Sequence, residues 1–288
     1  MSEPASIACA THIGAVALTV ADAQRIAAFY RDVLGFRVHL EAASQIALGA
    51  GGPDLLILHE NPQAPSPPAH STGLFHLAIL LPSRAALAQS LRQLAQSRTP
   101  LQGASDHLVS EALYLADPEG NGIEIYRDRP REQWLMRNGQ LQMSTDPLDI
   151  ESLMGELAQH DEPWPGLPPL TRIGHVHLRV ADIPAAEAFY HGVLGFNITT
   201  RYGPAASFLS AGGYHHHIGV NTWSSRGAAP PPPGARGLRH FTIQLPDEAE
   251  RDRTVARLIA SGHKVQRMPD GPFVRDPSGN ALLLLANS

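Results

Sequence analysis

The sequence predicts an α+β protein that is built from four βαβββ modules arranged in two halves. The main observation is a long repeat. Residues 11–36 read THIGAVALTVADAQRIAAFYRDVLGF, and 160 residues later residues 171–196 read TRIGHVHLRVADIPAAEAFYHGVLGF. A repeat of this length in register indicates two copies of one structural unit. A fainter repeat inside each half and a shared closing turn extend this interpretation to four modules.

Each copy of the long repeat opens with the same two elements. Residues 13–20 and 173–180 alternate between apolar and other residues, which predicts a strand with one buried face. Asp22 and Asp182 follow, and each is placed to cap the N-terminus of a helix. The order of strand and then helix is the start of a βαβββ module.

The fainter repeat supplies the second module of each half. Residues 73–97 predict a strand and then a helix capped near Ser83, and residues 237–262 repeat this pattern. Both halves close on a similar turn, DPEGN at 117–121 and DPSGN at 276–280, followed by an apolar strand. The four predicted modules cover residues 13–59, 73–128, 173–223 and 237–286.

The repeats predict two domains and a connection. The first domain covers residues 1–128, the connection 129–170 and the second domain 171–288. Within the connection, DPLDIESLMGELAQH predicts a short helix. The proline-rich stretches 62–68 and 230–233 are expected to be polyproline-like linkers or plain surface loops between modules.

Composition excludes several classes of protein. The 288 residues are 43% hydrophobic and 17% charged, with a net charge of −5, which is typical of a globular protein and favours neither nucleic acid nor an anionic membrane. No apolar run approaches the roughly 18 residues of a membrane span, and the N-terminus lacks a basic signal region. The single cysteine, Cys9, excludes an internal disulfide framework. We therefore expect a cytoplasmic protein.

The strand HVHLRVADI, followed by AFYHGVLGF and set in paired βαβββ modules, resembles the vicinal oxygen chelate superfamily. This superfamily includes glyoxalase I, the bleomycin-resistance proteins and the type I extradiol dioxygenases. The resemblance covers nearly the whole chain outside residues 129–170. It implies the glyoxalase/bleomycin resistance/dioxygenase fold, in which paired sheets curl into cups and metal ligands project from the first and last strands of the modules.

The resemblance also implies which residues bind the metal. The superfamily's ligand positions fall on Ala15, His76 and Glu124 in the first half, and on His175, His240 and Leu283 in the second. Neither half holds a complete set. His76 and Glu124 together with His175 make two histidines and one carboxylate, the usual ligands of oxygen-activating non-haem iron. This set requires a cup made of the later module of the first half and the early module of the second. If each half forms its own cup, the metal site is incomplete.

A local pattern of the extradiol dioxygenases supports the first half as the source of catalytic groups. His107 is followed by LVSEALY, then by DPEG and Glu124, so that His107, Tyr114 and Glu124 fall at the family's spacing. Ser105 departs from the residue types usual at its position. The second half lacks the pattern, because Val274 stands where the tyrosine is needed.

The second half is expected to supply an acid–base histidine. Its segment GGYHHHIGVNTW aligns with GGPDLLILHEN of the first half, and the extradiol enzymes place such a histidine on this strand. On a strand, His215 and His217 would face one side and His216 the other. We favour His217, with His215 as the next candidate.

The resemblance therefore implies a ring-cleaving extradiol dioxygenase. It would use iron(II), or manganese(II), and O₂ to open a catechol-type aromatic diol, with one metal site per chain. Two alternatives stay open, a glyoxalase-like metal-dependent isomerase or lyase and a metal-free binding protein of the bleomycin-resistance kind. The sequence fixes neither the substrate, the choice of metal, the role of His240, the oligomeric state nor whether modules are exchanged within one chain or between two.

Overall fold

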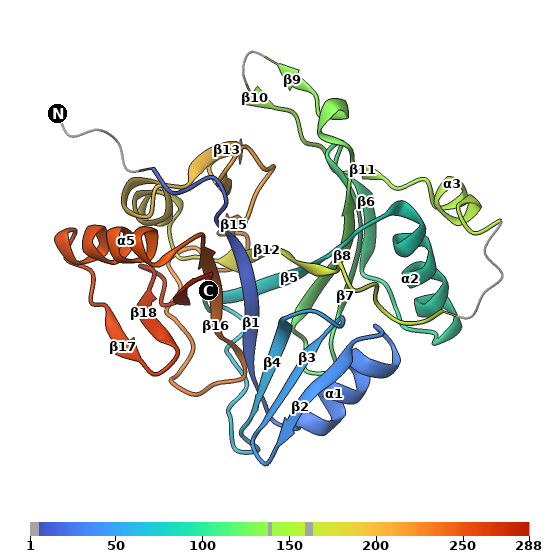
Figure 1. Ribbon diagram of the computed structural model, residues 1–288, viewed down its shortest axis with the longest axis horizontal. Helices are drawn as coiled ribbons and strands as arrows, with labels where there is room; N and C mark the ends of the chain where they lie inside the picture. The colour runs from blue at the N-terminus through green and yellow to red at the C-terminus, as the bar shows by residue number, and fades with distance from the viewer. Residues whose placement is uncertain (1–5, 138–139, 159–163, 288) are drawn as a thin grey trace. The chain divides into compact units, whose positions relative to one another are not determined.

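The computed structural model describes residues 6–137, 140–158 and 164–287, and its backbone separates into two compact units (Figure 1). Unit 1 comprises Met1–Leu18, Pro65–Phe75 and Gly174–Ser288. Unit 2 comprises Thr19–Ala64 and His76–Ile173. This division into units does not test the domain boundaries that the repeats predict, and those boundaries stay a prediction.

The four predicted βαβββ modules are confirmed, and with them the α+β class. The first module is β1 (His12–Val20), α1 (Ala23–Asp32), β2 (Arg37–Ala42), β3 (Gln45–Gly49) and β4 (Asp54–Glu60). The second is β5 (Gly73–Leu81), α2 (Arg84–Gln96), β6 (Gly103–Asp106), β7 (Ser110–Ala116) and β8 (Gly122–Asp128). The third is β12 (Arg172–Arg179), α4 (Ile183–Glu187) continued by η2 (Ala188–Val193), β13 (Asn197–Tyr202), β14 (Ala206–Ser210) and β15 (Ile218–Asn221). The fourth is β16 (Gly237–Leu245), α5 (Glu248–Ala260), β17 (Gln266–Met268), β18 (Gly271–Arg275) and β19 (Ala281–Ala286).

The connection between the halves carries short elements of its own. They are η1 (Arg131–Gln133), β9 (Met136–Arg137), β10 (Gln140–Leu141), β11 (Asp146–Pro147) and α3 (Ile150–Gly155). The predicted helix of this connection is α3, which begins where the side chain of Asp149 accepts a hydrogen bond from the backbone of Ser152. The β9–β10 hairpin extends away from the strands β6 to β8 of the same unit (Figure 1).

Within each unit the strands follow the module pattern. Unit 2 contains strands in the order β2, β3, β4 and, separately, β11, β6, β7, β8, β5. Unit 1 contains β12, β15, β14, β13 and also β17, β18, β19, β16, β1. In the second, third and fourth modules the opening strand pairs in parallel with the last one, as β5 does with β8, β12 with β15 and β16 with β19. The residues of a module's first and last strands are therefore neighbours in space.

The helices begin where the sequence predicts. The side chains of Asp22, Ser83 and Asp182 each accept a hydrogen bond from the backbone N–H three residues later. One difference separates the two long repeats. The helix after Asp182 widens into a π-helix over Ala188–Val193, whereas α1 stays α-helical throughout. The two segments have equal length, so no inserted residue explains the wider turn.

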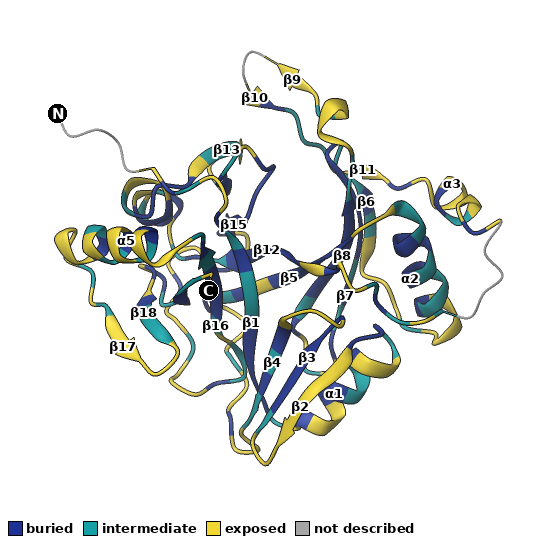
Figure 2. Cartoon of the chain, in the orientation of Figure 1, coloured by how far each residue is buried: buried dark blue, intermediate teal, exposed yellow. Residues whose placement is uncertain are grey.

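The sheet of β5 to β8 has two chemically different faces. Side chains of Leu77, Ile79, Ile123 and Ile125 are buried, as are the inward residues of α2, which makes that helix amphipathic (Figure 2). Strand alternation puts His76 and Glu124 on the opposite face. That face also carries an apolar cluster of Ala78, Leu80, Ala112 and Tyr126, with Tyr114 packed against it. The candidate ligands thus lie beside a small cluster of apolar side chains.

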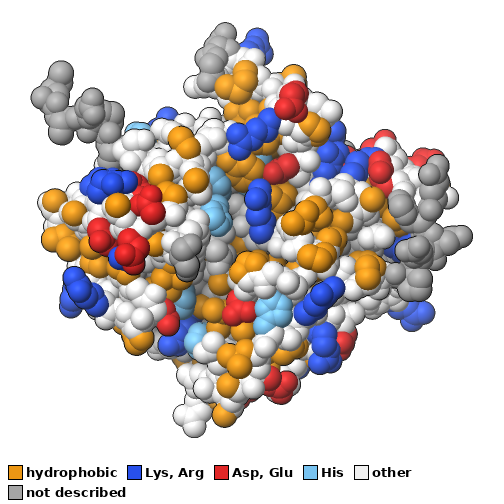
Figure 3. Space-filling model, viewed as in Figure 1, with side chains coloured by type: hydrophobic (Ala, Val, Ile, Leu, Met, Phe, Trp, Pro, Cys, Tyr) orange, Lys and Arg blue, Asp and Glu red, His pale blue; other side chains and the backbone are white. Residues whose placement is uncertain are grey.

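In the described part of the chain, no helix is long and apolar enough to cross a membrane. On the face shown in Figure 3, acidic and basic side chains are interspersed, and neither sign of charge forms a continuous field.

Candidate active site

The parallel pairing of β5 and β8 brings two predicted ligands together in unit 2. His76 lies opposite Gly122 in this ladder and Glu124 opposite Ala78, so both side chains leave the same face. The His76 Nε2 and the Glu124 Oε2 lie 3.0 Å apart. His76 is 6% exposed and Glu124 3% exposed, and a buried carboxylate requires a cation, a proton or strong hydrogen bonds.

His107 and Tyr114 form a second pair in the same unit. His107 lies in the tight turn between β6 and β7, and its Nε2 is 2.6 Å from the Tyr114 hydroxyl. Tyr114 lies directly opposite Glu124 in the antiparallel β7–β8 ladder, and its ring centroid is 5.8 Å from that of His76. The structure therefore brings His76, Glu124 and Tyr114 together on one face of this sheet. His107 contacts the same group through the Tyr114 hydroxyl.

A cluster of ion pairs between buried side chains stabilises this sheet close to the turn that contains His107. Glu111 is 2% exposed and lies 2.6 Å from Arg127 and 2.9 Å from Arg84. Burial raises the pKa of the Glu111 carboxyl, but the hydrogen bonds from Arg84 and Arg127 outweigh burial and leave the pKa below its usual value. Arg129 contacts Glu111 at 3.3 Å and also binds Asp106, the residue before His107. None of the predicted metal ligands belongs to this cluster. We therefore interpret its ion pairs as support for the structure of the sheet and the turn.

In unit 1, His175 lies on β12 and is 1% exposed. Two other histidine rings lie close to the His175 ring. The His216 ring lies 4.1 Å from the His175 ring, centroid to centroid, and the His215 ring lies 6.1 Å away. The Nδ1 atoms of His215 and His216 are 2.8 Å apart, so one of them donates a hydrogen bond to the other. A pair that shares a proton thus lies beside the predicted ligand.

The expectation that residues 215–217 lie on a strand is wrong, because β15 begins only at Ile218. The segment before β15 has no regular structure, so the alternation of a strand does not apply to it. All three histidines are buried, His216 included. The His217 ring lies 4.8 Å from the Tyr214 ring, and its Nδ1 accepts a hydrogen bond from the backbone N–H of Ala211. In neutral His217 the proton must therefore be on Nε2.

Unit 1 also holds His177 and His240. The His177 Nε2 lies 3.0 Å from the Asn221 side chain, and its ring lies 5.1 Å from that of Phe75. His240 lies on β16, with its ring 6.5 Å from that of Phe273. Alternation on β12 puts His177 on the same face as His175, a signal that the sequence already contained.

The donor chemistry fits a metal ion. The three predicted ligands are His76 and Glu124 in unit 2 and His175 in unit 1, and all three are buried. Their side chains offer two imidazole nitrogens and a carboxylate oxygen, which are donors that can hold a metal ion. Two histidines and one carboxylate suit divalent iron or manganese and leave coordination positions for other molecules.

Comparisons with known proteins agree with this chemistry. The family model of the Glyoxalase/Bleomycin resistance protein/Dioxygenase superfamily matches residues 12–125 and 172–284. A catechol-2,3-dioxygenase of Bacillus subtilis (strain 168) is 46% identical over 277 residues, which cover 95% of this chain and 96% of that protein.

Two solved structures share the fold. One is a presumed dioxygenase from Bacillus subtilis subsp. subtilis str. 168, with a TM-score of 0.66 and 13% identity, covering 98% of this chain and 86% of that one. The other is glyoxalase I from Zea mays, with a TM-score of 0.58 and 14% identity, covering 96% of this chain and 92% of that one. At these identities the structures establish a common fold and nothing about the reaction.

Proposed function

Since the chain belongs to the glyoxalase/bleomycin resistance protein/dioxygenase superfamily, we propose that it is an extradiol dioxygenase that opens the ring of a catechol-type diol with O₂. The observation that carries the proposal is the buried donor set of two histidines and one carboxylate in a chain 46% identical to a catechol-2,3-dioxygenase. A glyoxalase-like lyase would require a further carboxylate ligand, and the segment that would supply it carries His215–His217 instead.

His76, Glu124 and His175 would hold the metal, which we propose to be iron(II), with manganese(II) as the other candidate. When bound, such an ion would supply Lewis-acid chemistry for the diol and for O₂. This assignment requires modules from the two halves to contribute to one site. Whether they do so within one chain or between two chains is part of the proposal, as is a cytoplasmic location.

The protein's own groups would handle the protons and the substrate oxygens. Tyr114 would hydrogen-bond a diol oxygen from the ligand face of the β5–β8 sheet, and His107 would act on the diol through the Tyr114 hydroxyl. We assign the acid to His217, whose neutral ring carries its proton on Nε2 because Nδ1 accepts a hydrogen bond from the backbone of Ala211. His215 is the next candidate, through its shared proton with His216. Ala78, Leu80 and Ala112 present no polar group to the diol, which keeps water from competing for these hydrogen bonds.

Reconstitution under anaerobic conditions tests this function. The metal-free chain is loaded with iron(II) or manganese(II), and a panel of catechols is added with air. A yellow ring-opened product with either metal supports the proposal. If every catechol remains intact with both metals but binds the chain, the protein is a binding protein of the same fold.

A further inference from the structure

The connection between the halves contributes a hydrogen bond to the proposed substrate-binding pair. Ser144 lies just before β11, and β11 pairs antiparallel with β6, with Asp146 opposite Asp106 and Pro147 opposite Ser105. The carbonyl oxygen of Ser144 lies 2.6 Å from the His107 Nδ1, and its backbone N–H donates to the carbonyl of His107 at 3.3 Å. A segment outside all four modules thus holds the His107 imidazole.

This contact fixes where the imidazole proton is. A backbone carbonyl can only accept, so the His107 Nδ1 must carry a hydrogen. In the neutral ring the Nε2 is then an acceptor, and the Tyr114 hydroxyl, 2.6 Å away, must donate to it. The hydroxyl proton of Tyr114 points toward His107, so in any hydrogen bond with a substrate the Tyr114 oxygen must accept.

We propose that Ser144 is a positioning residue that locks His107 in the Nδ1–H tautomer and thereby makes Tyr114 a hydrogen-bond acceptor for a substrate hydroxyl. This inference rests on the proposed function for the identity of the substrate, a neutral diol O–H. The tautomer itself belongs to the free protein. A tyrosine held in this way binds the protonated diol and not an ether or ketone at the same position.

Two sets of contacts keep Ser144 and the His107 turn in place. The Ser144 hydroxyl lies 2.6 Å from the Asp146 carboxylate and 3.3 Å from the carbonyl of Asp106. On the other side, the Asp106 carboxylate accepts from the Leu108 backbone N–H at 2.9 Å and from Arg129. Leu108 has a φ of 67°, a conformation that costs free energy for a residue with a side chain and persists only when its surroundings hold it.

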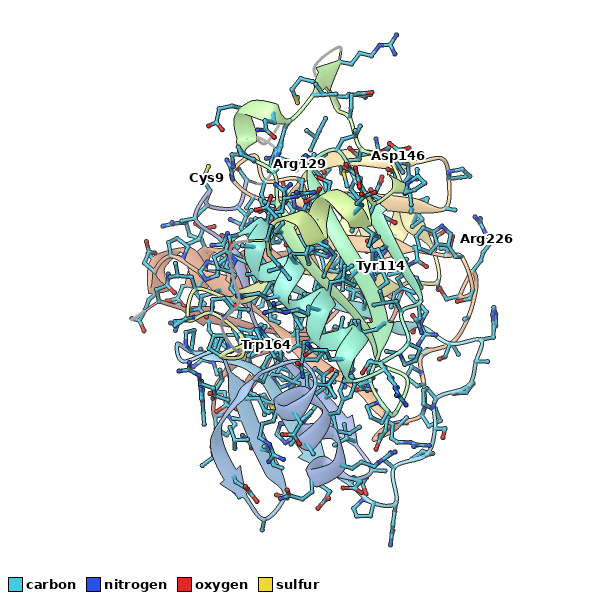
Figure 4. The ribbon with its side chains drawn as sticks, turned by 90° about the vertical axis from the view of Figure 1, so that its right-hand side faces the viewer. Cys9, Tyr114, Arg129, Asp146, Trp164 and Arg226 are labelled. Carbon is cyan, nitrogen blue, oxygen red and sulfur yellow. The ribbon has the colours of Figure 1, made fainter. Side chains whose placement is uncertain are left out.

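The side-chain view agrees with this arrangement. Arg129 and Asp146 lie toward the same end of the unit 2 strands, and Tyr114 lies farther along the sheet (Figure 4). Asp146 contacts Ser144 and Arg129 contacts Asp106, so both residues support the turn that contains His107.

Proton–nitrogen correlation NMR of the imidazole rings tests the tautomer in the full-length metal-free chain and in its diamagnetic zinc(II) form. The His107 signals are assigned by their loss in the His107→Gln protein. We expect a single Nδ1–H tautomer of His107 in the natural chain. A single Nε2–H tautomer there would overturn the proposal, whatever the catalytic activity.

The variants separate positioning from general stability. In Ser144→Ala and Asp146→Ala we expect mixed His107 tautomers and a fall in kcat/KM of about three- to tenfold at unchanged metal content, in line with one lost hydrogen bond. Ser144→Thr, which keeps the hydroxyl, should restore both readouts. Gln142→Ala is the matched control, because the Gln142 side chain donates to the Gln140 carbonyl in the same segment and is not among the contacts of Ser144 or His107 that the structure describes.

An unchanged tautomer and unchanged kcat/KM in both alanine variants would overturn the proposal, because they would show that the Ser144 hydroxyl and its contact with Asp146 do not hold the carbonyl against His107. If the tautomers respond as expected but no catechol is cleaved, the positioning role stands and the proposed function fails. The two failures can therefore be told apart.

Discussion

The Nε2 of His76 and the Oε2 of Glu124 lie 3.0 Å apart on two parallel strands that are paired by backbone hydrogen bonds. An imidazole and a carboxylate buried together at this distance are poised to share a cation. The proposed metal site is built outward from this pair, with His175 as the third donor.

Replacing Glu124 with alanine should remove the anionic ligand and so lower both metal affinity and turnover. We expect metal affinity to fall by more than about 100-fold, since even residues behind the ligands cost 10–100-fold when they are lost. Metal titration followed by competition with a chelator measures the change. Glu132→Ala, at an exposed position in η1, is the control and should bind metal like the natural chain. A Glu124→Ala protein with full metal affinity would remove Glu124 from the ligand set.

Metal analysis of anaerobically purified protein should give one equivalent of tightly bound iron or manganese per chain. The counterpart positions carry Ala15, His240 and Leu283, and neither a methyl group nor the buried Leu283 side chain can bind a metal. Two tightly bound equivalents would contradict this count and would direct attention to His240.

The acid–base assignment predicts a different outcome for His217→Phe. Metal should stay bound, because His217 is outside the proposed ligand set, while turnover should fall by roughly 10²–10⁴, the usual contribution of a positioned acid–base group. His215→Phe and His216→Phe are measured beside it, because His216 has the ring nearest to His175. Loss of metal from the His217 variant would make that residue a ligand. Unchanged turnover would move the acid–base role to the His215–His216 pair.

The Glu111 cluster predicts how stability depends on pH. The pKa of Glu111 in the folded protein lies below its ordinary value of 4.5, so its contribution to stability is present above that pH and is lost as the pH falls through the folded-state pKa. Glu111→Gln should be less stable at neutral pH and should lose less stability between neutral pH and acid. Urea unfolding at a series of pH values measures both effects, with Glu156→Gln, at the more exposed partner of Arg84, as the control. If the free energies of unfolding of the natural and Glu111→Gln proteins change with pH in parallel, the cluster is not the source of the pH dependence.

The modules and their helix caps could be predicted because their signals are local. A strand shows its alternation, and Asp22, Ser83 and Asp182 cap helices with side chains three residues from the donors they bind. These rules can be read from a single sequence. The ligand pair of unit 2 was predicted from the resemblance to the superfamily, whose ligand positions lie on the first and last strands of the modules.

The histidine segment 215–217 could not be placed in this way because its conformation depends on distant residues. Gly212 and Gly213 both have positive φ, and a side chain at Gly212 would collide with the backbone of Cys9. This close approach turns the chain before β15 can begin, so the strand starts at Ile218. The contact of Ser144 with His107 was equally hidden, because it joins a backbone carbonyl of the connection to a turn between two strands of a module.

The central claim, that the chain cleaves the ring of a catechol beside its hydroxylated carbons, is tested most directly with isotopically labelled dioxygen. The iron(II)-loaded protein is supplied with the labelled gas and the catechol it consumes fastest, and the product mass is measured. We expect a ring-opened aldehyde acid that contains both atoms of one O₂ molecule, cleaved outside the diol. A dicarboxylic acid cleaved between the two hydroxylated carbons, or a product without label, would contradict the account.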